Sequence, residues 1–151
     1  MTVPYHSIDE IEEVVRGFES CGTDKEDFTH ARHLTVAAWY LTRHPFEQAA
    51  EKMRSGLFHF LDHHEVPGEK YNETITLFWL KVVNAFVIGQ RGTSSSARKG
   101  PTLTNEQMLS LVNQLIQVFQ DTRLVFEYYS ESLLRSPAAK SGWVEPDLKQ
   151  F

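Results

Sequence analysis

Two histidines, His30 and His33, have the types and the spacing best suited to chemistry in this chain. They stand three positions apart in a segment whose apolar residues recur at helical spacing, so both side chains project from one side of a helix. On the same angular reckoning, Glu26 and Tyr40 fall close to them. Imidazole and carboxylate groups presented together in this way are ligands for Zn, Fe, Mn or Ni.

A metal site would need a further ligand from a facing helix, and Glu73 is the candidate. It stands near the start of a largely apolar segment, so we expect its carboxylate to be partly buried and to need a cation, a metal or hydrogen-bond donors. With His30 and His33 it would form the ligand set of open catalytic zinc sites and non-haem iron sites, which activate water or dioxygen. The sequence therefore predicts a divalent metal site, with Glu26 or Tyr40 beside its ligands.

The same residues also admit a structural role. His30 would then donate a hydrogen bond to a backbone carbonyl across a helix interface, while His33 and Glu26 would be half solvated. Glu73 would be stabilised by the first turn of its helix and paired with Lys70 or Arg32. In that case the protein is a non-catalytic helical module that binds a small apolar ligand or a partner protein.

Other chemistry has weaker support in the sequence. His59 and His63 form a pair four positions apart on the polar face of their segment, which is typical of solvated surface histidines. A haem is disfavoured because the chain has no Cys-x-x-Cys-His attachment motif. Nucleophilic catalysis is disfavoured because Cys21 has no adjacent base and there is no Gly-x-Ser-x-Gly elbow.

The composition is that of one globular domain spanning residues 1–151. Hydrophobic residues make up 41% and charged residues 23% of the chain. The net charge of -5 and a pI near 5.8, without a block of Lys and Arg, argue against nucleic-acid binding. We expect no membrane partner, because no apolar stretch approaches the roughly 20 residues that span a bilayer. A single cysteine and no secretory leader favour the cytoplasm.

Helical periodicity runs through the chain, and no segment alternates as a strand does, so we predict an all-α bundle. Residues 89–103 are rich in Gly and Ser and are expected to form a flexible loop. After the fifth main helix, start signals near Asp121, Ser130 and Ser136 predict short helical pieces, followed by an extended tail that Trp143 is expected to anchor against the bundle. The five main helices are expected from Ser7 to about Cys21, Thr23 to about Arg43, Pro45 to about Pro67, Tyr71 to Ile88, and Thr104 to about Asp121.

Three segments, at residues 28–34, 71–76 and 143–148, resemble those of a group of small, uncharacterised bacterial all-helical proteins. The resemblance runs from about residue 28 to the tail. In that group the second segment more often reads Tyr-His-Glu-Thr, whereas this chain has Asn72 in place of the histidine. The resemblance implies that the tail belongs to the domain, and it carries no activity.

Overall fold

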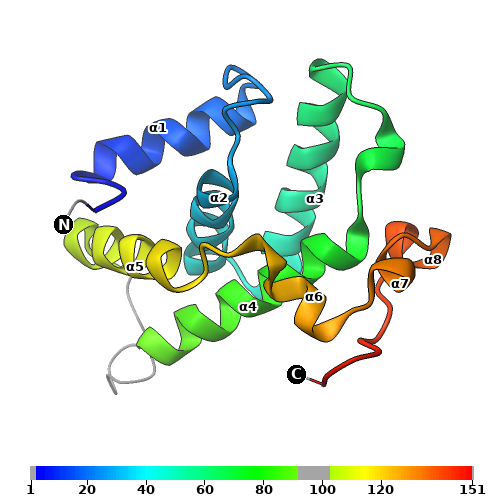
Figure 1. Ribbon diagram of the computed structural model, residues 1–151. Coiled ribbons are helices and arrows are strands. Elements are labelled where there is room, and N and C mark those ends of the chain that lie inside the picture. Colours follow the sequence, from blue (N-terminus) through cyan, green and yellow to red (C-terminus); the bar gives the residue numbers. More distant parts are fainter. Residues whose placement is uncertain (1–2, 92–102, 151) are drawn as a thin grey trace.

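The computed structural model describes residues 3–91 and 103–150, and all regular structure in these ranges is helical. No strand occurs in them, so the all-α prediction is confirmed, with five main helices and short C-terminal pieces (Figure 1). The main helices are α1 (Ile8–Glu19), α2 (His30–Arg43), α3 (Phe46–His63), α4 (Glu73–Arg91) and α5 (Asn105–Val118). The shorter elements are η1 (Gly68–Lys70), η3 (Thr122–Leu124), α6 (Val125–Tyr128), α7 (Glu131–Leu134) and α8 (Pro137–Ser141).

Side-chain caps set the starts of α1 and α5 where the sequence predicts them. The Glu10 carboxylate accepts a hydrogen bond from the backbone N–H of Ser7 at 3.1 Å. The Thr104 hydroxyl accepts from the N–H of Gln107 at 3.0 Å, and the Gln107 side chain accepts from the N–H of Thr104 at 2.9 Å. These bonds satisfy amides that have no partner inside the helix, which fixes where each helix begins.

The second helix begins later than predicted. It starts at His30, not at Thr23, and the Thr29 side chain accepts a hydrogen bond from a backbone amide of its first turn. Residues 24–27 form a turn before it, and Glu26 is exposed in that turn. The angular reckoning that placed Glu26 on the same helical face as the histidines is therefore wrong.

An aromatic cluster accounts for this boundary. The Phe28 ring stacks on Phe18, with ring centroids 4.9 Å apart, and lies 5.2 Å from Phe60. The non-helical segment before α2 thus places the Phe28 ring in contact with both α1 and α3. This tertiary contact and the cap at Thr29 together outweigh the four-residue capping-box spacing that begins at Thr23.

The helix α2 is central, because it contacts α1, α3, α4 and α5. In Figure 1 it lies in the middle of the bundle, with α3 on one side, and α4 contacts α2, α3, α5 and α8. Since α4 continues to Arg91, residues 89–91 of the predicted loop are helical. The rest of that loop, residues 92–102, lies outside the described residues.

None of the helices in the described ranges is long and apolar enough to cross a bilayer.

The short C-terminal helices begin at the predicted signals. The side chains of Asp121, Ser130 and Ser136 each accept a hydrogen bond from a backbone amide in the first turn that follows. The tail then returns to these helices, because Asp147 accepts bonds from the N–H and the hydroxyl of Ser130 at 2.8 and 2.6 Å. The tail is thus held against the domain.

Gly56 on α3 tests how tightly the aromatic cluster is packed. A Cβ at this position would lie 2.6 Å from Cε2 and 2.8 Å from Cζ of Phe18, which is fully buried. Alanine is favoured over glycine in a helix by about 1 kcal/mol, but overpacking costs about 1–3 kcal/mol. We expect Gly56→Ala to lower the free energy of unfolding in urea by about 1 kcal/mol.

The control is Gly89→Ala, because Gly89 is also helical and a Cβ there would meet nothing within 4 Å. That variant should be neutral or more stable by up to about 1 kcal/mol. If Gly56→Ala proves as stable as Gly89→Ala, the cluster is more loosely packed than the structure indicates.

Candidate functional site

His30 lies between helices and is used by the fold. Its Nε2 is 2.9 Å from the carbonyl oxygen of Phe119, the C-cap residue that follows α5, and its ring meets Trp79 edge-on at 4.5 Å between centroids. A protonated Nε2 therefore donates to one of the carbonyls that a helix C-terminus leaves without an internal partner. Burial lowers the pKa of His30, although the Phe119 carbonyl opposes the shift. This is the structural role that the sequence left open.

His33 is half-buried beside the aromatic cluster. Its ring centroid lies 5.6 Å from that of Phe28. Burial lowers the pKa of His33 to about 4, and the neighbouring His30 adds to the shift. The imidazole is consequently neutral near pH 7 and packs as an uncharged ring.

Glu73 is buried, with 8% of its surface exposed, as the sequence predicts for this carboxylate. Its partner is Arg54 on α3, not Lys70 or Arg32: Nε lies 3.1 and 3.2 Å from the two carboxylate oxygens, and Nη2 lies 2.5 Å from Oε2. The Tyr71 hydroxyl donates to Oε1 at 2.5 Å. Burial alone would raise the pKa of Glu73, but these hydrogen bonds and the guanidinium charge outweigh it, and the pKa is lowered.

The predicted ligands His30, His33 and Glu73 are not assembled into a metal site. Among the described residues, no group of three or more His, Cys, Asp or Glu side chains is arranged to hold a metal ion. The carboxylate of Glu73 is engaged by Arg54 and Tyr71. The physical reason is that a nearby guanidinium on a facing helix supplies the charge for which a metal was predicted.

The two residues predicted beside those ligands also have other roles. Glu26 is exposed in the turn before α2. The Tyr40 hydroxyl donates to Oε2 of Glu19 at 2.6 Å, and burial followed by this bond raises the pKa of Tyr40. Tyr40 thus connects α2 to the end of α1.

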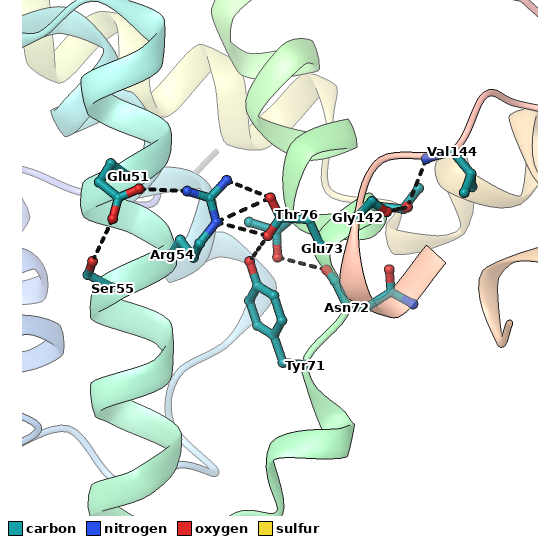
Figure 2. Close-up of polar contacts among 10 residues, drawn as sticks. Glu51, Arg54, Ser55, Tyr71, Asn72, Glu73, Thr76, Gly142 and Val144 are labelled. Carbon is teal, nitrogen blue, oxygen red and sulfur yellow. Dashed lines mark hydrogen bonds and ion pairs between the residues drawn. The ribbon is translucent and has the colours of Figure 1, made fainter. Parts of the chain in front are cut away.

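Arg54 is held from two sides and keeps free donors. Figure 2 shows its guanidinium between Glu51 on α3 and Glu73 at the start of α4. Its hydrogen bonds use the N–H of Nε and one N–H on each of Nη1 and Nη2. A guanidinium has five N–H donors, so one remains on each terminal nitrogen. The cluster therefore presents a fixed, planar cation that can take a further acceptor.

A cavity of about 290 Å³ adjoins this cluster, where α3 and α4 meet the segment that follows α8. Two aromatic rings, two cations and two carboxylates contribute to its lining. The lining residues are Phe46, Glu47, Ala50, Glu51, Arg54, Leu77, Lys81 and Trp143.

The Trp143 wall of this cavity is fixed through its neighbours in the chain. The Thr74 hydroxyl, fully buried on α4, donates to the carbonyl of Gly142 at 2.7 Å and accepts from the N–H of Val144 at 3.3 Å. The Tyr129 hydroxyl donates to the carbonyl of Val144 at 2.7 Å, and its ring packs edge-on against Trp143. The backbone on both sides of Trp143 is thus anchored, so the wall is preformed.

Two opposite charges in the cavity have no ionic partner among the residues that the structure describes. The Lys81 ammonium lies 5.0 Å from the ring centroid of Trp143 and 5.5 Å from that of Phe46, and within the described ranges it makes no ion pair or hydrogen bond. In the same ranges, the exposed carboxylate of Glu47 also makes none. The cavity thus offers one cation and one anion above aromatic walls.

Comparison with known proteins completes this description. The chain matches no family model, no curated protein and no solved structure.

Sequence reasoning missed most of this cavity. It identified Glu73 as a buried acid and Trp143 as an anchor for the tail, but it gave no role to Arg54, Lys81 or Phe46. Arg54 and Glu73 are 19 positions apart on different helices. The available signal was the buried acid itself, which requires a cation from somewhere in the bundle.

Proposed function

We propose that this protein is a non-catalytic helical module that binds a small zwitterion, an α-amino acid with an apolar or aromatic side chain, in the cavity between α3, α4 and the segment after α8. The observation that carries the proposal is the pair of unpartnered opposite charges, Lys81 and Glu47, in one cavity with two aromatic walls.

Separate charges of both signs favour a zwitterion over a simple anion or cation. Arg54 is already paired with two carboxylates, Glu51 and Glu73, so the cation and the anion that the described residues leave without an ionic partner are Lys81 and Glu47. The ligand carboxylate would meet Lys81 and the free donors of Arg54, and the ligand ammonium would meet Glu47. Both groups are exposed, so a ligand of single charge would pair with only one of them and would forgo the attraction of the other.

The walls favour an apolar side chain. Phe46, Leu77 and Trp143 are each half-buried around the cavity, so a flat or branched apolar group would cover surface that now faces water. A volume of about 290 Å³ stands at the lower end of the range for small-molecule sites, which suits a ligand the size of one amino acid.

The protonation states support binding rather than turnover. The pKa of Glu73 is lowered, and all the hydrogen bonds that it accepts come from Arg54 and Tyr71. Burial, and then the bond to Glu73, raise the pKa of Tyr71. Neither group is poised to exchange a proton near pH 7, which a general acid or base requires.

Isothermal titration with L-phenylalanine tests the proposal. We expect saturable binding that weakens at least about tenfold for phenylacetate, which lacks the ammonium, and for phenethylamine, which lacks the carboxylate. Lys81→Met and Glu47→Gln should each weaken binding by a similar factor. Lys52→Met is the matched control. Lys52 lies on α3, and its ammonium is also over an aromatic ring, that of Tyr40, but it is outside this cavity. Equal binding of all three compounds would contradict the proposal.

A further inference from the structure

The N-terminal arm, residues 3–6, is held on the bundle at one residue, Tyr5. The backbone N–H of Tyr5 donates to Oδ1 of Asn113 at 2.9 Å, and Nδ2 of Asn113 donates to the carbonyl of Tyr5 at 3.0 Å. One amide side chain on α5 thus satisfies both backbone groups of Tyr5. In an extended chain the N–H and C=O of one residue point to the same side, so this contact imitates one rung of an antiparallel sheet.

The side chain of Tyr5 is recognised as well. Its hydroxyl lies 2.9 Å from Oγ1 of Thr35, which is fully buried on α2. The Thr35 hydroxyl is 2.7 Å from the carbonyl of Ala31 and gives its single proton there, so Tyr5 is the donor to Thr35. A phenylalanine would fill the same space but would leave Thr35 without this donor.

Within residues 3–6, Tyr5 is the residue that Asn113 and Thr35 contact. Val3 is 40% exposed, and the backbone N–H groups of His6 and Ser7 donate to Glu10 in the cap of α1. Beside the tyrosine, a cavity of about 370 Å³ is bounded in part by Pro4 and Arg32. The contacts with Asn113 and Thr35 therefore hold Tyr5 closely, and the neighbouring cavity leaves room beside it.

We propose that Asn113 and Thr35 form a receptor site for a peptide segment that carries an extended tyrosine, and that the protein's own arm occupies it in cis. The partner is a flexible segment of another protein that presents tyrosine after proline, with its backbone N–H and C=O free to bond Asn113. Such a segment competes with the arm, because it supplies the same three hydrogen bonds, and it displaces the arm once its concentration exceeds the arm's effective concentration. This site is separate from the cavity beside Arg54, and neither proposal depends on the other.

The test uses the full chain with the arm weakened by Tyr5→Ala and the peptide Val-Pro-Tyr-His-amide with fluorescein attached to its N-terminal amine. Fluorescence anisotropy should show binding to Tyr5→Ala at least about tenfold tighter than to the wild type, whose arm competes at an effective concentration of about millimolar. Replacing the peptide tyrosine by alanine should abolish binding. Adding Asn113→Ala to Tyr5→Ala should abolish it too, whereas adding Gln114→Ala, at an exposed neighbour on α5, should not.

A measurement on the wild-type chain covers the case in which Tyr5→Ala fails to fold. Asn113 should protect the Tyr5 amide from hydrogen exchange, and a saturating excess of the unlabelled peptide should accelerate that exchange, while the alanine peptide should not. The proposal is overturned if a folded Tyr5→Ala chain binds both peptides equally. It is also overturned if that chain does not fold and the wild-type exchange rate is unchanged by the tyrosine peptide.

Discussion

Replacing Arg54 by methionine is expected to lower the free energy of unfolding by about 2–4 kcal/mol. The substitution keeps much of the apolar stem but leaves the Glu73 carboxylate, 8% exposed, with Tyr71 as its remaining side-chain donor. Removing one member of a buried ion pair costs about 3–5 kcal/mol, and the lower range allows for the 33% exposure of the Arg54 side chain. Urea unfolding followed by circular dichroism at pH 7 measures the difference.

A second substitution separates the cost of the orphaned charge from lost packing. In Arg54→Met with Glu73→Gln, the buried charge is gone and an amide can still accept from Tyr71. We expect this double variant to recover at least about 1 kcal/mol relative to Arg54→Met alone. The control is Arg135→Met, which removes an exposed pair with Glu131 and should cost no more than about 0.5 kcal/mol. An Arg54→Met chain as stable as this control would contradict the role assigned to Glu73.

The starts of the helices were predictable where the determinants are local. The capping pairs at Ser7 and Thr104, and the signals at Ser130 and Ser136, are each complete within four residues of sequence, and each begins a helix in the structure. The spacing that begins at Thr23 is equally complete, yet no helix begins there. A tertiary contact accounts for this difference. The segment before α2 places the Phe28 ring against Phe18 of α1 and Phe60 of α3, and a helix does not begin until after Phe28.

The candidate site was predictable only in part for the same reason. Burial of Glu73 follows from its place in an apolar helix, and a role for His30 between helices follows from its position at the edge of the core face. Their partners, Arg54 and the carbonyl of Phe119, lie 19 and 89 positions away and are set by how the helices pack. An ion pair and a metal site make the same demand on a buried carboxylate, so periodicity alone could not choose between them.

Trp143 in the tail has two roles, which both follow from how the tail packs on the bundle. The sequence indicates that Trp143 anchors the tail, and the hydrogen bonds from Thr74 and Tyr129 to its neighbours explain how. The same anchoring places the Trp143 ring over Lys81. The tail therefore packs against the bundle and also forms a wall of the proposed ligand cavity.

Acidification from pH 6.5 to pH 4 is expected to destabilise the protein through His33. Above pH 6.5 the imidazole is neutral in both the folded and the unfolded chain, so its full contribution is present. As the pH falls, the unfolded chain binds a proton near pH 6.5 while the folded chain resists until its pKa of about 4. The loss is on the order of 3 kcal/mol and is complete below pH 4. His30, whose pKa is also lowered, adds in the same direction.

The variant His33→Leu isolates this effect, because leucine packs beside Phe28 and does not titrate. The free energy of unfolding of the wild type, measured in urea at pH 7, 6, 5 and 4.5, should fall more steeply than that of His33→Leu over the whole interval. The control His59→Leu replaces an exposed histidine on α3 and should keep the wild-type slope. The carboxylates Glu73, Asp121 and Asp147, whose pKa values are lowered, lose their contributions mainly at still lower pH. A slope unchanged in His33→Leu would show that His33 is hydrated in the folded protein, since only a desolvated imidazole resists protonation in this interval.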